Sequence, residues 1–180
     1  MCICGDFLQY FANTIKLTIF FIIISFSTTS LISNSIYPIL ILGMLAGPFV
    51  AYLFLKKKGV YNSCVLIVFL LETAFVTMGF YNHFTLAIYI GNLSLGITMT
   101  SSIILCPIAT YYLRGPASFL RVFPIVTIGF FAGFILSNPI LLLPIDTLTS
   151  SNFFLKMIGL ILIAFFTIFS TWKSRFVLLK

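Results

Sequence analysis

Six long apolar runs constrain the fold of this chain more than any other feature. An α-helix needs about 20 residues to cross the hydrocarbon of a bilayer, and each run is close to that length or longer. The links between the runs are short, and short links make successive helices antiparallel neighbours. The pattern predicts an all-α integral membrane protein, a six-transmembrane-helix bundle with spans at about 15–33, 37–55, 60–81, 84–112, 122–143 and 153–172.

The composition indicates lipid as the surrounding medium. Hydrophobic residues make up 61% of the 180 residues and charged residues 7%, whereas a soluble domain has about 25% charged residues. The net charge of +7 does not indicate nucleic acid as a partner, because the basic residues lie at the ends of apolar runs. A nucleic-acid-binding domain gathers them on one polar face.

The positions of the basic residues predict the topology. With the N-terminus in the cytoplasm, nine of the ten basic residues fall on the cytoplasmic side, where membrane proteins concentrate them. The exception is Lys156, whose long side chain can reach the headgroups from the start of the last span. We therefore expect both ends inside, with a cytoplasmic lead-in at 1–14, a single transmembrane domain at 15–172 and a cytoplasmic basic tail at 173–180. A bacterial inner or plasma membrane fits this pattern best. The cytoplasmic residues that set the topology are Lys56, Lys57, Lys58, Arg114 and Arg121, together with Lys16, Lys173, Arg175 and Lys180.

Two G-x-x-x-G motifs predict close helix packing. Gly43 and Gly47 lie in the second run, and Gly129 and Gly133 in the fifth. Glycines four residues apart share a helix face and allow another backbone to come close. A purely structural role is one interpretation, and sliding of these faces during a conformational cycle is the other. Pro48 follows Gly47 and removes a helical hydrogen bond, so we expect a kink in the second span.

The reactive side chains argue against an enzyme. The chain has three acidic residues, Asp6, Glu72 and Asp146, and a single histidine, His83. It lacks the His/Glu/Asp cluster of a metalloprotease, a G-x-S-x-G serine motif and a phosphate-binding G-x-x-x-x-G-K-[ST] loop. We expect no catalytic residue, no metal and no cofactor.

Glu72 is the one acidic residue near the middle of a predicted span. A lone carboxylate in hydrocarbon is costly, so it must be protonated, paired or in contact with a wet cavity. It is either a proton-coupling residue or a neutral acid bonded to a neighbouring helix, and the sequence leaves both open.

Two polar stripes predict the lining of a solute path. One lies in the fourth span and the other in the first, and each keeps to one helix face. Serine and threonine often only bond their own helix, so the alternative is a packing role. If both stripes border a common cavity, a neutral or amphipathic small-molecule solute fits it. The path candidates are Asn92, Ser94, Thr98, Ser101 and the adjacent Ser102 in the fourth span, and Ser25, Thr28 and Thr29 in the first.

The order of these features resembles the N-terminal six-helix half of a major facilitator superfamily transporter. The resemblance covers about residues 7–175 and rests on LAGPFVAYLFLKKK at 45–58, GNLSLG at 91–96, YYLRGP at 111–116 and the second G-x-x-x-G motif. It implies alternating access, a path lined by the first and fourth spans, and two inverted repeats of three spans. Three features depart from the family pattern: the aspartate before the basic run is replaced by Leu55 or Lys56, the arginine early in span four is absent, and the chain has six spans instead of twelve.

The sequence thus favours a half-length or truncated secondary transporter that pairs with a second half, either a copy of itself or a partner chain. Two other functions stay open: the substrate-binding membrane subunit of an ATP-driven importer, and a structural membrane protein without transport activity. The sequence does not name the solute.

Overall fold

The computed structural model describes residues 3–32, 36–81, 84–141 and 151–178, and all secondary structure in these ranges is α-helical. The all-α prediction is therefore confirmed. Four of the helices are long and apolar enough to cross a membrane, and the last contains a shorter apolar stretch, Met157–Ser170. The chain is thus a multi-pass membrane protein. The helices are α1 (Ile3–Ile32), α2 (Tyr37–Phe80), α3 (Thr85–Arg114), α4 (Pro116–Leu141) and α6 (Ser151–Leu178).

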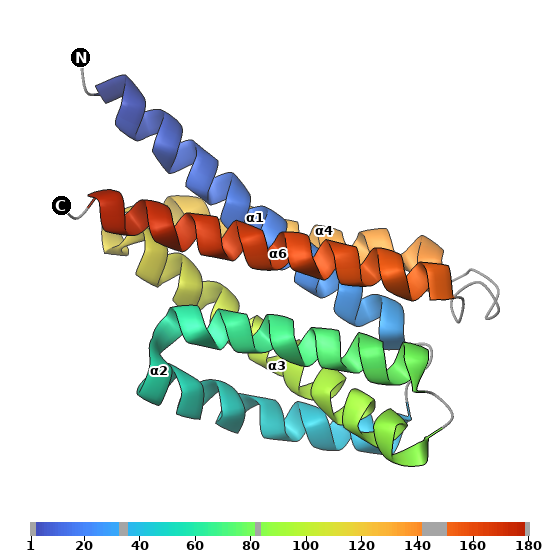
Figure 1. Cartoon of the computed structure of the whole chain (residues 1–180). Helices are drawn as coiled ribbons and strands as arrows, with labels where there is room; N and C mark the ends of the chain where they lie inside the picture. Colours follow the sequence, from blue (N-terminus) through green and yellow to red (C-terminus); the bar gives the residue numbers. More distant parts are fainter. Residues whose placement is uncertain (1–2, 33–35, 82–83, 142–150, 179–180) are drawn as a thin grey trace.

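The described residues form five helices and not the six expected, because the second and third runs join in α2. Lysine is a good helix former, so Lys56–Lys58 continue the helix where the sequence suggested a loop. Only Gly59 leaves the helical conformation inside α2, with φ 79° and ψ 176°. At this residue the chain reverses, and the first arm (residues 37–58) and the second arm (residues 60–80) run in opposite directions (Figure 1). The first arm stays helical through Pro48, because Gly59 is the only residue of α2 with non-helical backbone angles.

The reversal depends on a backbone conformation that only glycine adopts readily, so Gly59→Ala is expected to destabilise the fold by about 1–3 kcal/mol. No atom lies within 4 Å of a Cβ added at Gly59, which means that the cost comes from the backbone alone. The thermal midpoint of the detergent-solubilised protein, followed by circular dichroism, measures it. Gly159→Ala in α6 is the matched control, because its added Cβ also meets nothing. Equal midpoints for the two variants would show that the reversal does not need glycine.

Helices at the two ends of the chain begin and end outside the expected spans. α1 starts at Ile3 and α6 ends at Leu178, so most of the expected lead-in and tail is helical. Residues 1–2 and 179–180 lie outside the described residues.

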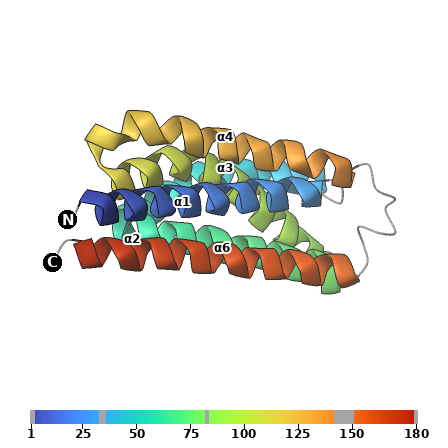
Figure 2. The ribbon, with the colours of Figure 1, turned by 90° about the horizontal axis from the view of Figure 1, so that it is seen from above.

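Two helix pairs form the framework of the bundle. α2 packs most extensively on α3, and α1 packs on α4, while α6 contacts α1 and α2. Successive helices and arms run in alternating directions, and Figures 1 and 2 place both termini at the same end of the bundle. The Gly59 reversal and the α3–α4 connection lie at this end too (Figure 1). The basic positions near these four points therefore gather at one end.

Candidate functional site

Glycine residues bring α2 and α3 into backbone contact. A Cβ added at Gly43 would clash with Leu93 O and lie 3.1 Å from the Cα of Gly96. Ser101 of α3 donates a hydrogen bond from Oγ to the carbonyl of Gly47 (3.0 Å). The first arm of α2 and α3 are therefore joined through small residues and a serine–carbonyl bond.

The contact between α1 and α4 is built in the same way. A Cβ added at Gly133 would clash with Ile22 O and with Ser25 Oγ, and one added at Gly129 would clash with the Thr18 methyl group. Ser25 of α1 donates from Oγ to the carbonyl of Phe130 (2.6 Å). In both pairs, a helix with G-x-x-x-G thus accepts a hydrogen bond from a serine of the neighbouring helix.

The two pairs also occupy corresponding places in the chain. The first pair joins the second and fourth apolar runs, and the second pair joins the fifth and first. Exchanging each of the first three runs with the run three places later converts one pair into the other and reverses its direction, because successive runs alternate in direction (Figure 1). The same local chemistry therefore occurs twice between the first three runs and the last three, in opposite orientations.

Most of the predicted path residues are buried and bonded to their own helix. Thr28 donates to Ile24 O (2.9 Å) and to Ser25 O (2.9 Å), Thr29 donates to Ser25 O (2.6 Å), and Thr98 donates to Ser94 O (2.8 Å). None of the three pockets described below is lined by a predicted path residue. Their role in a solute path stays a prediction.

Asn92 has a more specific structural role. Its side-chain amide donates to Ile88 O (2.8 Å), and its Oδ1 accepts the backbone N–H of Ile36 (2.7 Å). This second bond ties the start of α2 to α3, because Ile36 is the residue before α2. Ser94 is also buried on α3.

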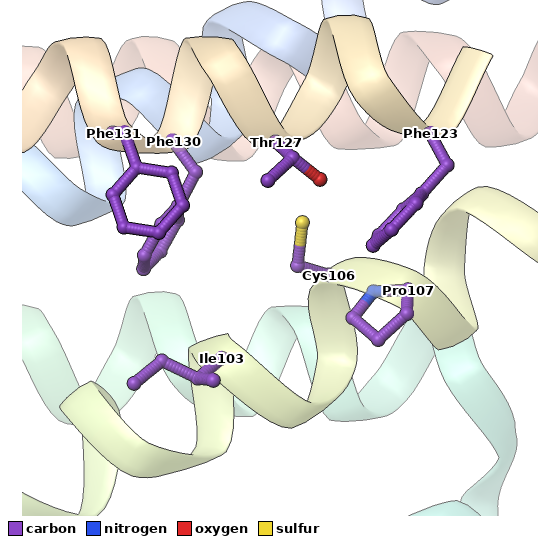
Figure 3. A pocket seen from close by; sticks show the side chains of 7 residues that line it. All are labelled: Ile103, Cys106, Pro107, Phe123, Thr127, Phe130 and Phe131. Atoms are coloured by element: carbon purple, nitrogen blue, oxygen red, sulfur yellow. The ribbon is translucent and has the colours of Figure 1, made fainter. Parts of the chain in front are cut away.

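A pocket of about 240 Å³ lies between α3 and α4. Figure 3 shows the Cys106 thiol pointing across it toward Thr127. The Thr127 hydroxyl is buried and has no hydrogen-bond partner among the residues that the structure describes. This pocket was not predicted from the sequence, although Pro107 and the aromatic residues of α4 are signals for it. The lining residues are Ile103, Cys106, Pro107, Phe123, Thr127, Phe130 and Phe131.

Glu72 lies in a second pocket of about 210 Å³, between the second arm of α2 and α6. This pocket contains no residue of α1 or α3, so it does not bring Glu72 together with the polar stripes. The other lining residues are Val65, Val68, Phe69, Leu162 and Phe165.

The predicted topology residues of the two inner connections lie near the end of the bundle that holds both termini. Lys56, Lys57 and Lys58 are exposed just before the reversal, and Lys56 Nζ lies 6.0 Å from the centre of the Tyr52 ring. Arg114 is the last residue of α3. Arg121 is exposed and borders a third pocket, of about 400 Å³, between α1 and α4.

The described residues contain no group of three histidine, cysteine, aspartate or glutamate side chains that could hold a metal ion. Cys64 and Cys106 are buried free thiols. No protein-family model, no curated protein and no solved structure matches the chain.

Proposed function

We propose that this chain is half of a facilitator-type secondary transporter, which moves a small solute by rocking against a second half. The observation that carries the proposal is the repeated pair of glycine-mediated contacts, α2 with α3 and α1 with α4. Secondary transporters are commonly built from such inverted repeats. The resemblance to the N-terminal half of the major facilitator superfamily supports the same reading.

The proposal includes six membrane crossings, two of them by the arms of α2, with both ends in the cytoplasm of a bacterial cell. The gathering of basic positions at one end of the bundle supports this orientation. The second half is another copy of the chain or a partner chain. Exposed apolar side chains along the first arm of α2, such as Leu45 and Phe49, offer it a surface.

Glu72 is the proposed proton-coupling residue. Its carboxyl group lies in a spanning arm and borders a pocket, so it can exchange a proton during the cycle. Glu72 shares no pocket with the polar stripes, so a solute held at the stripes would be coupled to Glu72 only through movement of α2.

Proteoliposomes containing the purified chain and an internal pH-sensitive dye test the proposal. Neutral, cationic and anionic small solutes are added one class at a time across an imposed pH gradient. We expect one class to cause protein-dependent proton movement, and we expect Glu72→Gln to abolish the proton movement at neutral pH. The control is Gln9→Glu, which adds a carboxyl group outside the proposed spans. It should change neither the proton movement nor the uptake of the solute.

The outcomes separate the rival functions. Solute uptake that requires an added ATPase and ATP would indicate an importer subunit. No uptake in any class, with the chain correctly folded, would contradict every transport function and leave a structural role.

A further inference from the structure

The Glu72 pocket combines one carboxyl group with an otherwise apolar and aromatic lining. Phe69 contributes from the turn before Glu72 on the same arm, and Phe165 contributes from α6. Val65, Val68 and Leu162 supply the remaining wall. Glu72 is therefore the single ionisable side chain that borders this pocket.

No partner within the described residues satisfies this carboxyl group. Glu72 forms neither a hydrogen bond nor an ion pair there. Lys16 of α1, which lies beside α6, donates instead to Ser170 Oγ (2.8 Å). An ionised carboxyl group in such a position is costly until a cation reaches it.

The lining suits a cation that carries apolar groups. A positive charge is attracted both to the carboxylate and to the faces of aromatic rings such as Phe69 and Phe165. Its alkyl groups would contact the valine and leucine side chains. A strongly hydrated cation gains little here, because the lining offers it no further oxygen ligand.

The size and position of the pocket restrict the ligand further. A volume of about 210 Å³ is smaller than the roughly 300–1,000 Å³ of drug-sized sites, so it holds a small cationic head and not a large rigid molecule. Phe69 and Leu162 are 65% and 46% exposed, which leaves the pocket open on the outer side of the bundle, where lipid lies. An alkyl tail can therefore remain in the bilayer.

The depth of Glu72 favours a free solute over a lipid headgroup. Glu72 lies thirteen residues beyond Gly59 and eight before Phe80, which corresponds to roughly 20 Å and 12 Å along the helix. A headgroup amine is anchored at the membrane surface beside its own phosphate. A small amphiphilic cation that partitions into the hydrocarbon reaches this depth more readily.

We infer that the pocket between the second arm of α2 and α6 binds a lipophilic organic monocation, with Glu72 as its counter-ion. This inference names the solute class of the proposed transporter and in that sense rests on the proposed function. Binding at the pocket requires one chain and no transport cycle, so the two can be tested separately.

Equilibrium binding of radiolabelled decyltrimethylammonium to the chain in phosphatidylcholine nanodiscs is the test. The expected result is saturable binding above that of empty nanodiscs, displaced by unlabelled cation but not by decanol or decyl sulfate. Glu72→Gln should weaken the affinity by about tenfold or more, because the attraction between the carboxylate and the cation is lost. The lipid is the same in every sample and cannot produce this difference.

A second variant tests the pocket with the carboxyl group intact. Leu162→Trp fills the pocket and should also weaken binding, whereas Ile163→Trp adds the same ring at an exposed neighbouring position that does not line the pocket. Equal affinity of the wild type and Glu72→Gln, or equal displacement by decanol, would overturn the inference. Binding without transport would contradict the proposed function alone. Proton-coupled transport of a different solute class, without cation binding, would contradict this inference alone.

Discussion

Replacing Gly96 with leucine is expected to separate α2 from α3 and to destabilise the fold by about 3 kcal/mol or more. A Cβ at this position would clash with Leu40 O, and it would lie 2.8 Å from the backbone nitrogen of Met44 and 2.9 Å from the Cα of Gly43. All three are backbone atoms, which cannot rotate away as a side chain can. The first arm of α2 and α3 must therefore move apart, and their backbone contact is lost.

The thermal midpoint and the size-exclusion profile of the detergent-solubilised protein measure this effect. Gly159→Leu adds the same side chain to α6, where no atom lies within 4 Å of the added Cβ, and should leave both unchanged. A midpoint for Gly96→Leu that is no lower than that of the control would contradict the close α2–α3 contact.

Gly133→Leu is the corresponding change in the α1–α4 pair, and we expect a loss of about 2–4 kcal/mol from overpacking and a broken hydrogen bond. The added side chain would collide with Ile22 O and displace Ser25, whose hydroxyl then loses the carbonyl of Phe130. The same measurements and the same control apply.

The two glycine variants together test whether the pairs are independent structural units. Their contacts share no residue, so the free energies of the single variants should add in the double variant to within about 0.5 kcal/mol. If Gly133→Leu is as stable as the wild type, only the α2–α3 pair is closely packed. The repeated pair of glycine-mediated contacts would then no longer support the proposed function.

The glycine motifs show which part of the helix packing can be predicted from the sequence and which part cannot. G-x-x-x-G predicted which faces of the second and fifth runs come close to other helices. It could not identify Gly96 as the partner, because the nearest glycine in that run, Gly91, is five residues away and outside the motif. A close approach needs space on both helices, and the sequence of one helix does not specify its neighbour.

Polar residues and pockets were harder to predict for a related reason. The periodicity placed the residues of each polar stripe on one helix face, and Thr28, Thr29 and Thr98 are buried there. It could not distinguish a hydroxyl that bonds its own helix from one that borders a cavity. The pocket at Cys106 depends on the gap between α3 and α4, which no single run encodes. Glu72 stood out because a charge in an apolar run is visible without its surroundings.

The reversal at Gly59 is central to the proposed function, because two crossings by α2 put the reversal on the same side as both ends of the chain. Single cysteines at Tyr37, Lys57 and Phe84, which are all exposed, report the side directly when the four native cysteines are replaced by serine. A membrane-impermeant maleimide is applied to right-side-out vesicles before and after permeabilisation. We predict that the cysteines at 37 and 84 react from outside and that the cysteine at 57 reacts only after permeabilisation. Labelling of positions 57 and 84 from the same side would contradict the account, since the second arm of α2 would then not cross the membrane.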